Sequence, residues 1–324
     1  MKFNRPAFVG VRAARLAMAL SFAMAAAGCA TVAAPPATVV LPASSPFPES
    51  LTAAADGTLF VSSITHGGVL KIAPGTSTAV PFFKPGEHGT RSTFGVLADD
   101  KRGVLWVASN DASVFGMKGP SAVEGAWIKG FDLKSGALKS SARLPVAPAV
   151  ANDFAIADDG SLYITNNVAP QILRLKPGAA DIEVFMQDDA LKGGLDGIAI
   201  GRDGHLYVNT FVTGELFRIE VKSGSPGKVT KLKTSRPLTH PDGLRPFRGD
   251  FIMVEGGGTL DRITIDGDSA KVETIAEVVE PTSVWLTADR VWVSEGQFSY
   301  LLNPEKKGQV PESFKLRALP LPKY

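Results

Sequence analysis

Residues 152–178 read NDFAIADDGSLYITNNVAPQILRLKPG, and this stretch decides the fold. It predicts an apolar strand from Asn152 and then a tight turn at Asp159 and Gly160, because glycine tolerates the positive φ that hairpins need. A second strand is predicted at residues 162–164 and a third at residues 172–175, closed by a Pro-Gly pair. β-Branched and aromatic residues fill the segments between turn signals, and no helical period competes with them.

Five other stretches repeat this unit with a period of about 45 residues, at 49–75, 94–131, 195–224, 241–267 and 281–302. The predicted second strands are continuous apolar runs, as expected for strands buried on both faces, at 59–61, 105–107, 162–164, 206–208, 252–254 and 291–293. Several strands in each repeat are typical of a propeller blade. The sequence therefore predicts an all-β fold, a six-bladed β-propeller with four-stranded blades, over residues 49–324.

The charge of the chain argues against nucleic acid as a partner. The formal net charge of the 324 residues is +2, and no basic stripe interleaved with aromatic residues occurs. We therefore expect a small-molecule partner and no nucleic acid.

Residues 1–29 predict a signal peptide, with basic residues up to Arg15 and then an apolar run at 16–27 that is short for a membrane span. The run ends in Ala-Ala-Gly-Cys, which is similar to a bacterial lipobox with Cys29 as the lipidated residue. The alternatives are simple cleavage after the small residues and an incidental cysteine. We expect export to the bacterial cell envelope or periplasm, with a membrane anchor at Cys29.

Two terminal segments frame the repeats. Residues 30–48 are rich in Ala, Pro, Val and Ser and predict a linker, although residues 38–41 could instead form an outer strand that helps to close the ring. The C-terminal tail predicts the outer strand of blade six at residues 314–319.

The starts of the six inner strands predict the functional face, where the connections after the second strands also converge. The residues at these starts are Glu49, Phe94, Asn152, Asp196, Asp242 and Thr282. Carboxylates close to the central axis repel one another unless a cation compensates, and carboxylate and amide oxygens suit Ca²⁺. We therefore expect a divalent metal, with Ca²⁺ first, held by Glu49, Asn152, Asp196 and Asp242. The alternative is that these residues only line a wet channel or cap turns.

Other residues are candidates for substrate binding on the same face. They are Asn152, His66, His240 and Asn110; either histidine could be a general base or simply a loop residue. The insertion after Asn110 predicts a lid with an apolar underside made by Phe115, Met117 and Trp127, or else an edge without a role. Candidates of second rank are Asn166, Asn167, Glu255 and Glu295.

The inner-strand starts resemble the regucalcin–gluconolactonase family, also called the senescence-marker-protein type, with paraoxonase-type and strictosidine-synthase-like propellers as more distant relatives. The matching motifs are Glu49-Ser50, Asn152-Asp153, Pro241-Asp242-Gly243 and Pro281-Thr282-Ser283. The resemblance implies a divalent metal, often calcium, on Glu49 and Asp242, with Asn152 beside metal or substrate. Two positions depart from the family: Asp196 stands in place of an asparagine, and Val150 in place of an arginine of gluconolactonases.

The activity that the resemblance implies is metal-dependent hydrolysis of a lactone or related ester in the central channel. The ion would polarise the carbonyl group, and Asp242 first, or Asp196 second, would activate water as the general base. Asn152 would hydrogen-bond substrate or metal-bound water. The alternative is a non-catalytic, NHL-like binding propeller of the envelope, with a structural metal or none, because propellers carry many unrelated functions.

Overall fold

The computed structural model describes residues 1–4, 37–306 and 308–322. Most of the predicted signal peptide, Cys29 and the first part of the predicted linker lie outside these residues, so the expectations of export and lipidation stay predictions. By chain contacts, the described residues from position 37 onward belong to one compact unit. None of the helices among the described residues has the length and the apolar run that crossing a bilayer requires.

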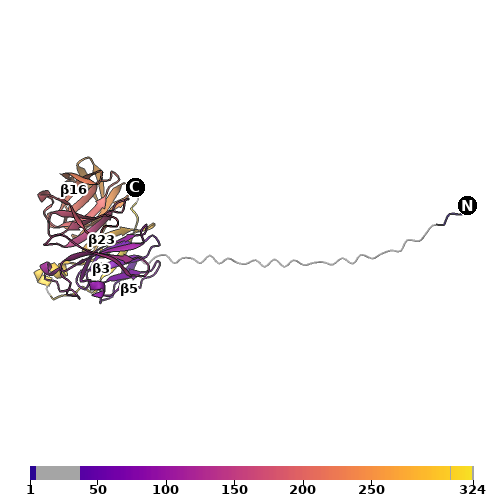
Figure 1. Cartoon of the computed structure of the whole chain (residues 1–324), viewed down its shortest axis with the longest axis horizontal. Helices are drawn as coiled ribbons and strands as arrows, with labels where there is room; N and C mark the ends of the chain where they lie inside the picture. Colours follow the sequence, from indigo (N-terminus) through magenta and orange to yellow (C-terminus); the bar gives the residue numbers. More distant parts are fainter. Residues whose placement is uncertain (5–36, 307, 323–324) are drawn as a thin grey trace. The chain divides into compact units, whose positions relative to one another are not determined.

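The described residues form six antiparallel sheets, which confirms the six-bladed propeller. The inner strands are β2 (Pro48–Ala53), β6 (Ser92–Asp99), β10 (Ala151–Ile156), β14 (Leu195–Ile200), β19 (Pro241–Phe247) and β23 (Pro281–Leu286). Each contacts the inner strands of the two neighbouring blades, and β2 contacts β23, so that the ring closes. Figure 1 labels β3 (Leu59–Ser63) in the first blade and β23 in the last.

The second strands follow the inner ones across hairpins. Besides β3 they are β7 (Val104–Asn110), β11 (Leu162–Asn166), β15 (Leu206–Thr210), β20 (Asp250–Glu255) and β24 (Arg290–Glu295). Every residue of β3, β11 and β15 is buried, as their continuous apolar runs predict. The predicted Asp-Gly turns join inner and second strands at the face opposite the site, and Gly57, Gly160 and Gly204 all have positive φ.

The third and fourth strands complete the blades. The third strands are β4 (Val69–Ile72), β8 (Ala126–Asp132), β12 (Gln171–Leu175), β16 (Glu215–Lys222), β21 (Thr259–Asp266) and β25 (Lys315–Pro320). The fourth strands are β5 (Ala79–Phe83), β9 (Leu138–Arg143), β13 (Glu183–Gln187), β17 (Ser225–Lys231), β22 (Ser269–Glu277) and β1 (Thr38–Val40). In blade five, β18 (Lys233–Thr234) adds a short parallel fifth strand beside β22.

Short helices lie in the connections. They are η1 (Glu87–Gly89), η2 (Ser113–Phe115), η3 (Asp189–Leu191), α1 (Ser299–Leu302) and η4 (Pro304–Lys306).

Blade six is built from both ends of the propeller, with the strand order β1-β25-β24-β23. The prediction that the C-terminal tail forms the outer strand was therefore wrong: β25 is the third strand, and β1 pairs outside it, Val39 opposite Leu316. Of the two alternatives for residues 38–41, the structure has the closing strand. Residues 38–48 thus belong to the propeller, which begins before the predicted boundary at residue 49.

The closing strand has one core side chain. Val39 is fully buried, whereas its neighbour Val40 is 56% exposed. We expect Val39→Asp to lower the free energy of unfolding by about 3 kcal/mol, because it buries an unpaired carboxylate at the seam. Val40→Asp is the matched control and should be nearly neutral. Urea unfolding measures both, and equal stabilities of the two variants would contradict the closure by β1.

Candidate functional site

A β-bulge at the start of each inner strand presents one residue to the axis. The register between inner and second strand shifts at Pro48/Leu51, Thr93/Val96, Ala151/Phe154, Leu195/Ile198, Pro241/Leu244 and Pro281/Ser283. The six residues named above at the inner-strand starts all lie within these shifts. Bulges are common beside functional sites because the extra residue turns a side chain out of the ladder.

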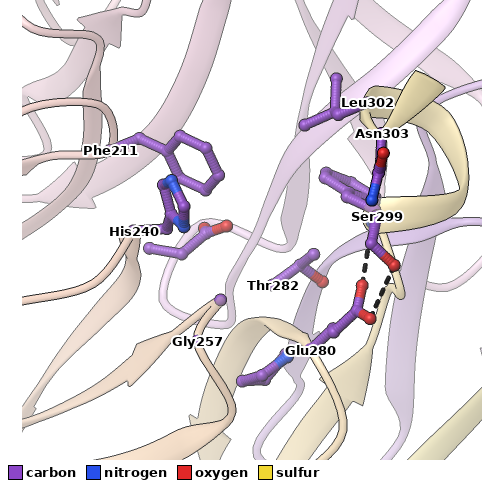
Figure 2. Close-up of a pocket in the computed structure, with 12 residues that line it drawn as sticks. Phe211, His240, Gly257, Glu280, Thr282, Ser299, Leu302 and Asn303 are labelled. Atoms are coloured by element: carbon purple, nitrogen blue, oxygen red, sulfur yellow. Dashed lines mark hydrogen bonds between the residues drawn. The ribbon is translucent and has the colours of Figure 1, made fainter. Parts of the chain in front are cut away.

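Five of those six residues line one cavity of about 240 Å³ at the mouth of the ring: Glu49, Phe94, Asn152, Asp196 and Asp242. The sixth, Thr282, lines a neighbouring cavity of about 500 Å³. The two cavities share Asp242, Phe211, Phe298 and Leu302. Figure 2 shows the second cavity, with Phe211 and His240 on one side and Glu280 with Ser299 on the other. The inner-strand starts therefore meet, as the repeat alignment predicts.

Three carboxyl groups form the floor of the first cavity. Glu49, Asp196 and Asp242 are all buried, and the carboxyl atoms Glu49 Oε2 and Asp196 Oδ1 have no hydrogen-bond partner. Burial first, and then the neighbouring Asp196 carboxylate, raise the pKa of Glu49 well above its usual value. Burial, followed by the charges of Asp196 and Glu49, does the same to the pKa of Asp242. The floor therefore resists full ionisation unless a positive charge joins it.

Asp196 and Asp242 each shift the pKa of the other. Burial raises the pKa of Asp196 to about 7, and the Asp242 and Asn152 side chains lower it in part. The Asp196 carboxyl in turn adds to the raised pKa of Asp242, after burial. Asn167 adds a long contact from Nδ2 to Asp196 Oδ2, 3.5 Å, and a hydrogen bond to the Leu195 carbonyl, 3.2 Å. Asn167 is thus part of the site.

The donor chemistry of the floor fits a hard divalent cation. Two unpartnered carboxylate oxygens and the amides of Asn152 and Asn167 offer oxygen ligands, which Ca²⁺ prefers. Among the described residues, no group of three or more His, Cys, Asp or Glu side chains is arranged so that it could hold a metal ion as it stands. Binding would therefore draw the carboxylates closer together, which their mutual repulsion opposes without the ion.

Next to this floor, a buried ion pair crosses the channel from blade three to blade five. Arg245 Nη1 lies 2.5 Å from Asp153 Oδ2, and Nη2 donates to Asp153 Oδ1 at 2.9 Å. The guanidinium also lies over the Trp285 ring, 5.2 Å from its centroid. Its charge lowers the pKa of Asp196 somewhat, after burial and the stronger local effects. The groups packed beside the floor are therefore a polar, charged pair.

The histidines have different surroundings. His240 lines the second cavity, where its ring stacks on Phe211 at 4.9 Å between centroids (Figure 2). It stands at φ 52°, a strained conformation for a non-glycine residue that is common at functional sites. His66 is exposed, its Nδ1 lies 3.0 Å from Thr65 Oγ1, and it lines neither cavity.

Asn110 does not have the predicted place in substrate binding. Its side chain is buried, Nδ2 donates to the Ala151 carbonyl at 2.7 Å, and Oδ1 accepts from the Ala151 amide at 2.9 Å. The amide is held by the backbone of the next blade, and Asn110 lines neither cavity. The prediction fails for a physical reason. Asn110 bonds to the inner strand of the next blade, and the sequence of its own repeat does not show that contact.

The remaining second-rank residues hold the chain that enters each inner strand. Asn166 Oδ1 accepts from the Val150 amide, Glu255 Oε2 from the Thr239 amide, and Glu295 Oε1 from the Val279 amide. None of these three residues lines either of the two cavities.

The insertion in blade two does reach the cavity. Phe115 and Met117 line it, as the predicted lid requires. Trp127 instead belongs to strand β8, where Lys129 Nζ lies over its ring, 5.3 Å from the ring centroid. A second cover was not predicted. Phe298 and the α1 residues Leu301 and Leu302 also line the cavity, and the only signal in the sequence was an apolar cluster just after the last second strand.

The comparisons with known proteins give the fold. No protein-family model matches this chain, and no curated protein matches its sequence. Among solved structures, a gluconolactonase from Xanthomonas campestris is similar with a TM-score of 0.61 and 16% identity, covering 87% of this chain and 89% of its own.

Two other solved structures of this fold carry different activities. Virginiamycin B lyase from Staphylococcus aureus has a TM-score of 0.58 and 17% identity, covering 87% and 98% of the two chains. Aldose sugar dehydrogenase from Streptomyces coelicolor, in its PQQ-bound form, has a TM-score of 0.58 and 17% identity, covering 88% and 100%. Gluconolactonases are thus among the structural neighbours, as the motif resemblance predicts, but likeness at this identity shows only the fold.

The raised carboxyl pKa values predict a pH dependence of stability. The folded-state pKa of Asp196, about 7, lies above the unfolded value, so the folded chain binds more protons between these pKa values. With a chelator present, the free energy of unfolding should therefore fall as the pH rises from about 4 to about 7. Urea unfolding at pH 5 and pH 7 measures this. Asp196→Asn should flatten the profile, and Asp266→Asn, an exposed control, should not.

The channel ion pair predicts a second stability effect. Asp153→Ala leaves the buried Arg245 charge unpaired and should cost about 3–5 kcal/mol. The double variant Asp153→Leu with Arg245→Met replaces the pair by apolar groups and should regain most of that loss. Equilibrium unfolding measures both, and a double variant as unstable as the single one would contradict the ion pair as the cause.

Proposed function

We propose that this propeller is a hydrolase that opens a lactone or related ester at the floor of the axial cavity, with a divalent cation, Ca²⁺ first. The observation that carries the proposal is the set of three buried carboxyl groups, two of them with unpartnered oxygens, that line one cavity. Such a cluster destabilises the folded chain, and strongly perturbed carboxyls in a cavity are typical of functional sites. The gluconolactonases among the structural neighbours support this class of reaction.

The residues that would hold the cation are Glu49, Asp196, Asp242 and Asn152. Bound there, the ion would polarise the substrate carbonyl and stabilise the negative charge that forms on its oxygen. Asn152 would direct its amide to substrate or to water at the floor.

Asp242 would be the general base, because it lies in both cavities and its raised pKa makes it a stronger base than an ordinary carboxylate. It accepts a proton from water, whose oxygen forms a bond to the carbonyl carbon. The bond between that carbon and the ring oxygen then breaks, and the departing oxygen takes the proton from Asp242. The product of a lactone is a single hydroxy acid. Asp196 is the second candidate for this base.

Two features favour the enzyme over a non-catalytic NHL-like binder. The face carries a hollow over carboxyl groups, and the groups packed beside those carboxyls are the polar Asp153–Arg245 pair. Val150, which stands where gluconolactonases carry an arginine, is buried and lines neither cavity. Export and a lipid anchor at Cys29 remain part of the proposal.

The test combines binding and turnover in the purified chain. We expect saturable Ca²⁺ binding by calorimetry after chelator treatment, and hydrolysis of a panel of small lactones that EDTA abolishes. Asp242→Asn should lower kcat/KM at least about 100-fold, since general-base catalysis contributes that much. Asp266→Asn, on the outer hairpin of blade five, is the matched control and should leave both unchanged.

The other outcomes decide against parts of the proposal. Ca²⁺ binding without turnover of any lactone would favour a binding propeller with a structural metal. Turnover that survives EDTA would contradict the metal. If the chain neither binds Ca²⁺ nor turns over any lactone, the proposal of a hydrolase at this site is overturned.

A further inference from the structure

We infer that the substrate of this site carries an apolar chain, an alkyl-substituted lactone or ester, and is not a sugar lactone. The inference rests on the proposed function, since it names the substrate class of the same cavity. Its evidence is the contrast between the floor and the walls.

Polar and apolar residues are separated in the cavity. The five polar residues that line it are the floor residues Glu49, Asn152, Asp196 and Asp242 and the neighbouring Asn167. The other nine lining residues are all apolar. Phe94 lies at the start of inner strand β6, and the other eight come from connections, including Phe115 and Met117 of blade two, Val212 of blade four, and Phe298, Leu301 and Leu302 of blade six. A polar reacting group at the floor would therefore extend into an apolar wall.

The rim of this wall is exposed to water. Phe115 is 40% exposed, Leu302 58% and Val212 73%, and all three line the same cavity. Large apolar side chains gathered around a hollow are typical of a ligand site, because an apolar ligand removes their surface from water.

A sugar lactone fits this wall poorly. Each sugar hydroxyl that loses water in the cavity needs a hydrogen-bond partner, or its burial costs free energy. Above the floor residues, the wall has no side-chain donor or acceptor among the residues that line it. An alkyl chain needs none, and it gains free energy with each methylene that it buries.

The adjoining cavity differs in chemistry. His240, Glu280, Thr282, Ser299 and Asn303 line it, and the Glu280 carboxylate accepts from the Ser299 amide and hydroxyl, at 2.8 and 2.7 Å (Figure 2). Because Asp242 lies in both cavities, the reacting carbonyl has an apolar side and a more polar side. The alkyl chain is assigned to the apolar side.

The experiment uses γ-lactones with side chains from methyl to octyl, and glucono-δ-lactone, with the full chain and Ca²⁺. The expected kcat/KM rises roughly three- to four-fold per added methylene until the chain fills the cavity, which is the effect of burying each methylene. Glucono-δ-lactone should be the poorest substrate. Phe115→Ser should lower the octyl-to-methyl ratio of kcat/KM about ten-fold. Leu138→Ser is the matched control, because Leu138 is also 40% exposed but lies on the outer strand β9.

A binding series separates this inference from the proposed function. γ-Lactams with the same side chains resist hydrolysis, and calorimetry measures their affinity without any turnover. Affinity that rises with chain length and falls in Phe115→Ser would support the apolar site, even if no lactone were hydrolysed. Affinity and kcat/KM that do not change with chain length, or a preference for glucono-δ-lactone, would overturn it.

Discussion

The structure depends on hydrogen bonds that run from the second strand of one blade to the inner-strand backbone of the next. The Thr165 hydroxyl of blade three donates to the Asp196 carbonyl at 2.7 Å, and the Asn209 amide of blade four donates to the Asp242 carbonyl at 2.6 Å. Backbones meet closely there: a Cβ on Gly197 would stand 2.3 Å from the Asp242 carbonyl oxygen. The same bonds that join the blades therefore fix the backbone of both site carboxylates.

Rigid placement explains how the chain keeps an unfavourable cluster. Each inner strand is paired with its second strand on one side and packed against the inner strands of the neighbouring blades. The carboxyls of Glu49, Asp196 and Asp242 are therefore held near one another despite their repulsion. The Asp153–Arg245 pair brings one positive charge nearby, but that charge is already bound to its own carboxylate. A cation that binds there would relieve the repulsion that destabilises the folded chain. Stability, its pH dependence and the proposed activity therefore depend on the same group of side chains.

The cavity is shaped by elements that differ from blade to blade. The repeated strands supply the floor, whereas the insertion in blade two and helix α1, between β24 and β25 of blade six, supply much of the apolar wall. Solved propellers of this fold act as a gluconolactonase, a lyase and a sugar dehydrogenase, so the common scaffold does not select a substrate. In this chain, the irregular connections are where specificity would be decided.

The sequence alone determined the repeat, the six second strands, the far-end turns and the set of residues that face the axis, because strand period and turn chemistry are local signals. Features that depend on contacts between residues far apart in the chain were decided only by the tertiary structure. It placed β1 outside β25, engaged Asn110 with the backbone of the next blade, and gathered Phe115 and Leu302 around one hollow. These contacts join segments far apart in the chain, and their energies arise only when the ring closes. No local sequence pattern therefore predicts them.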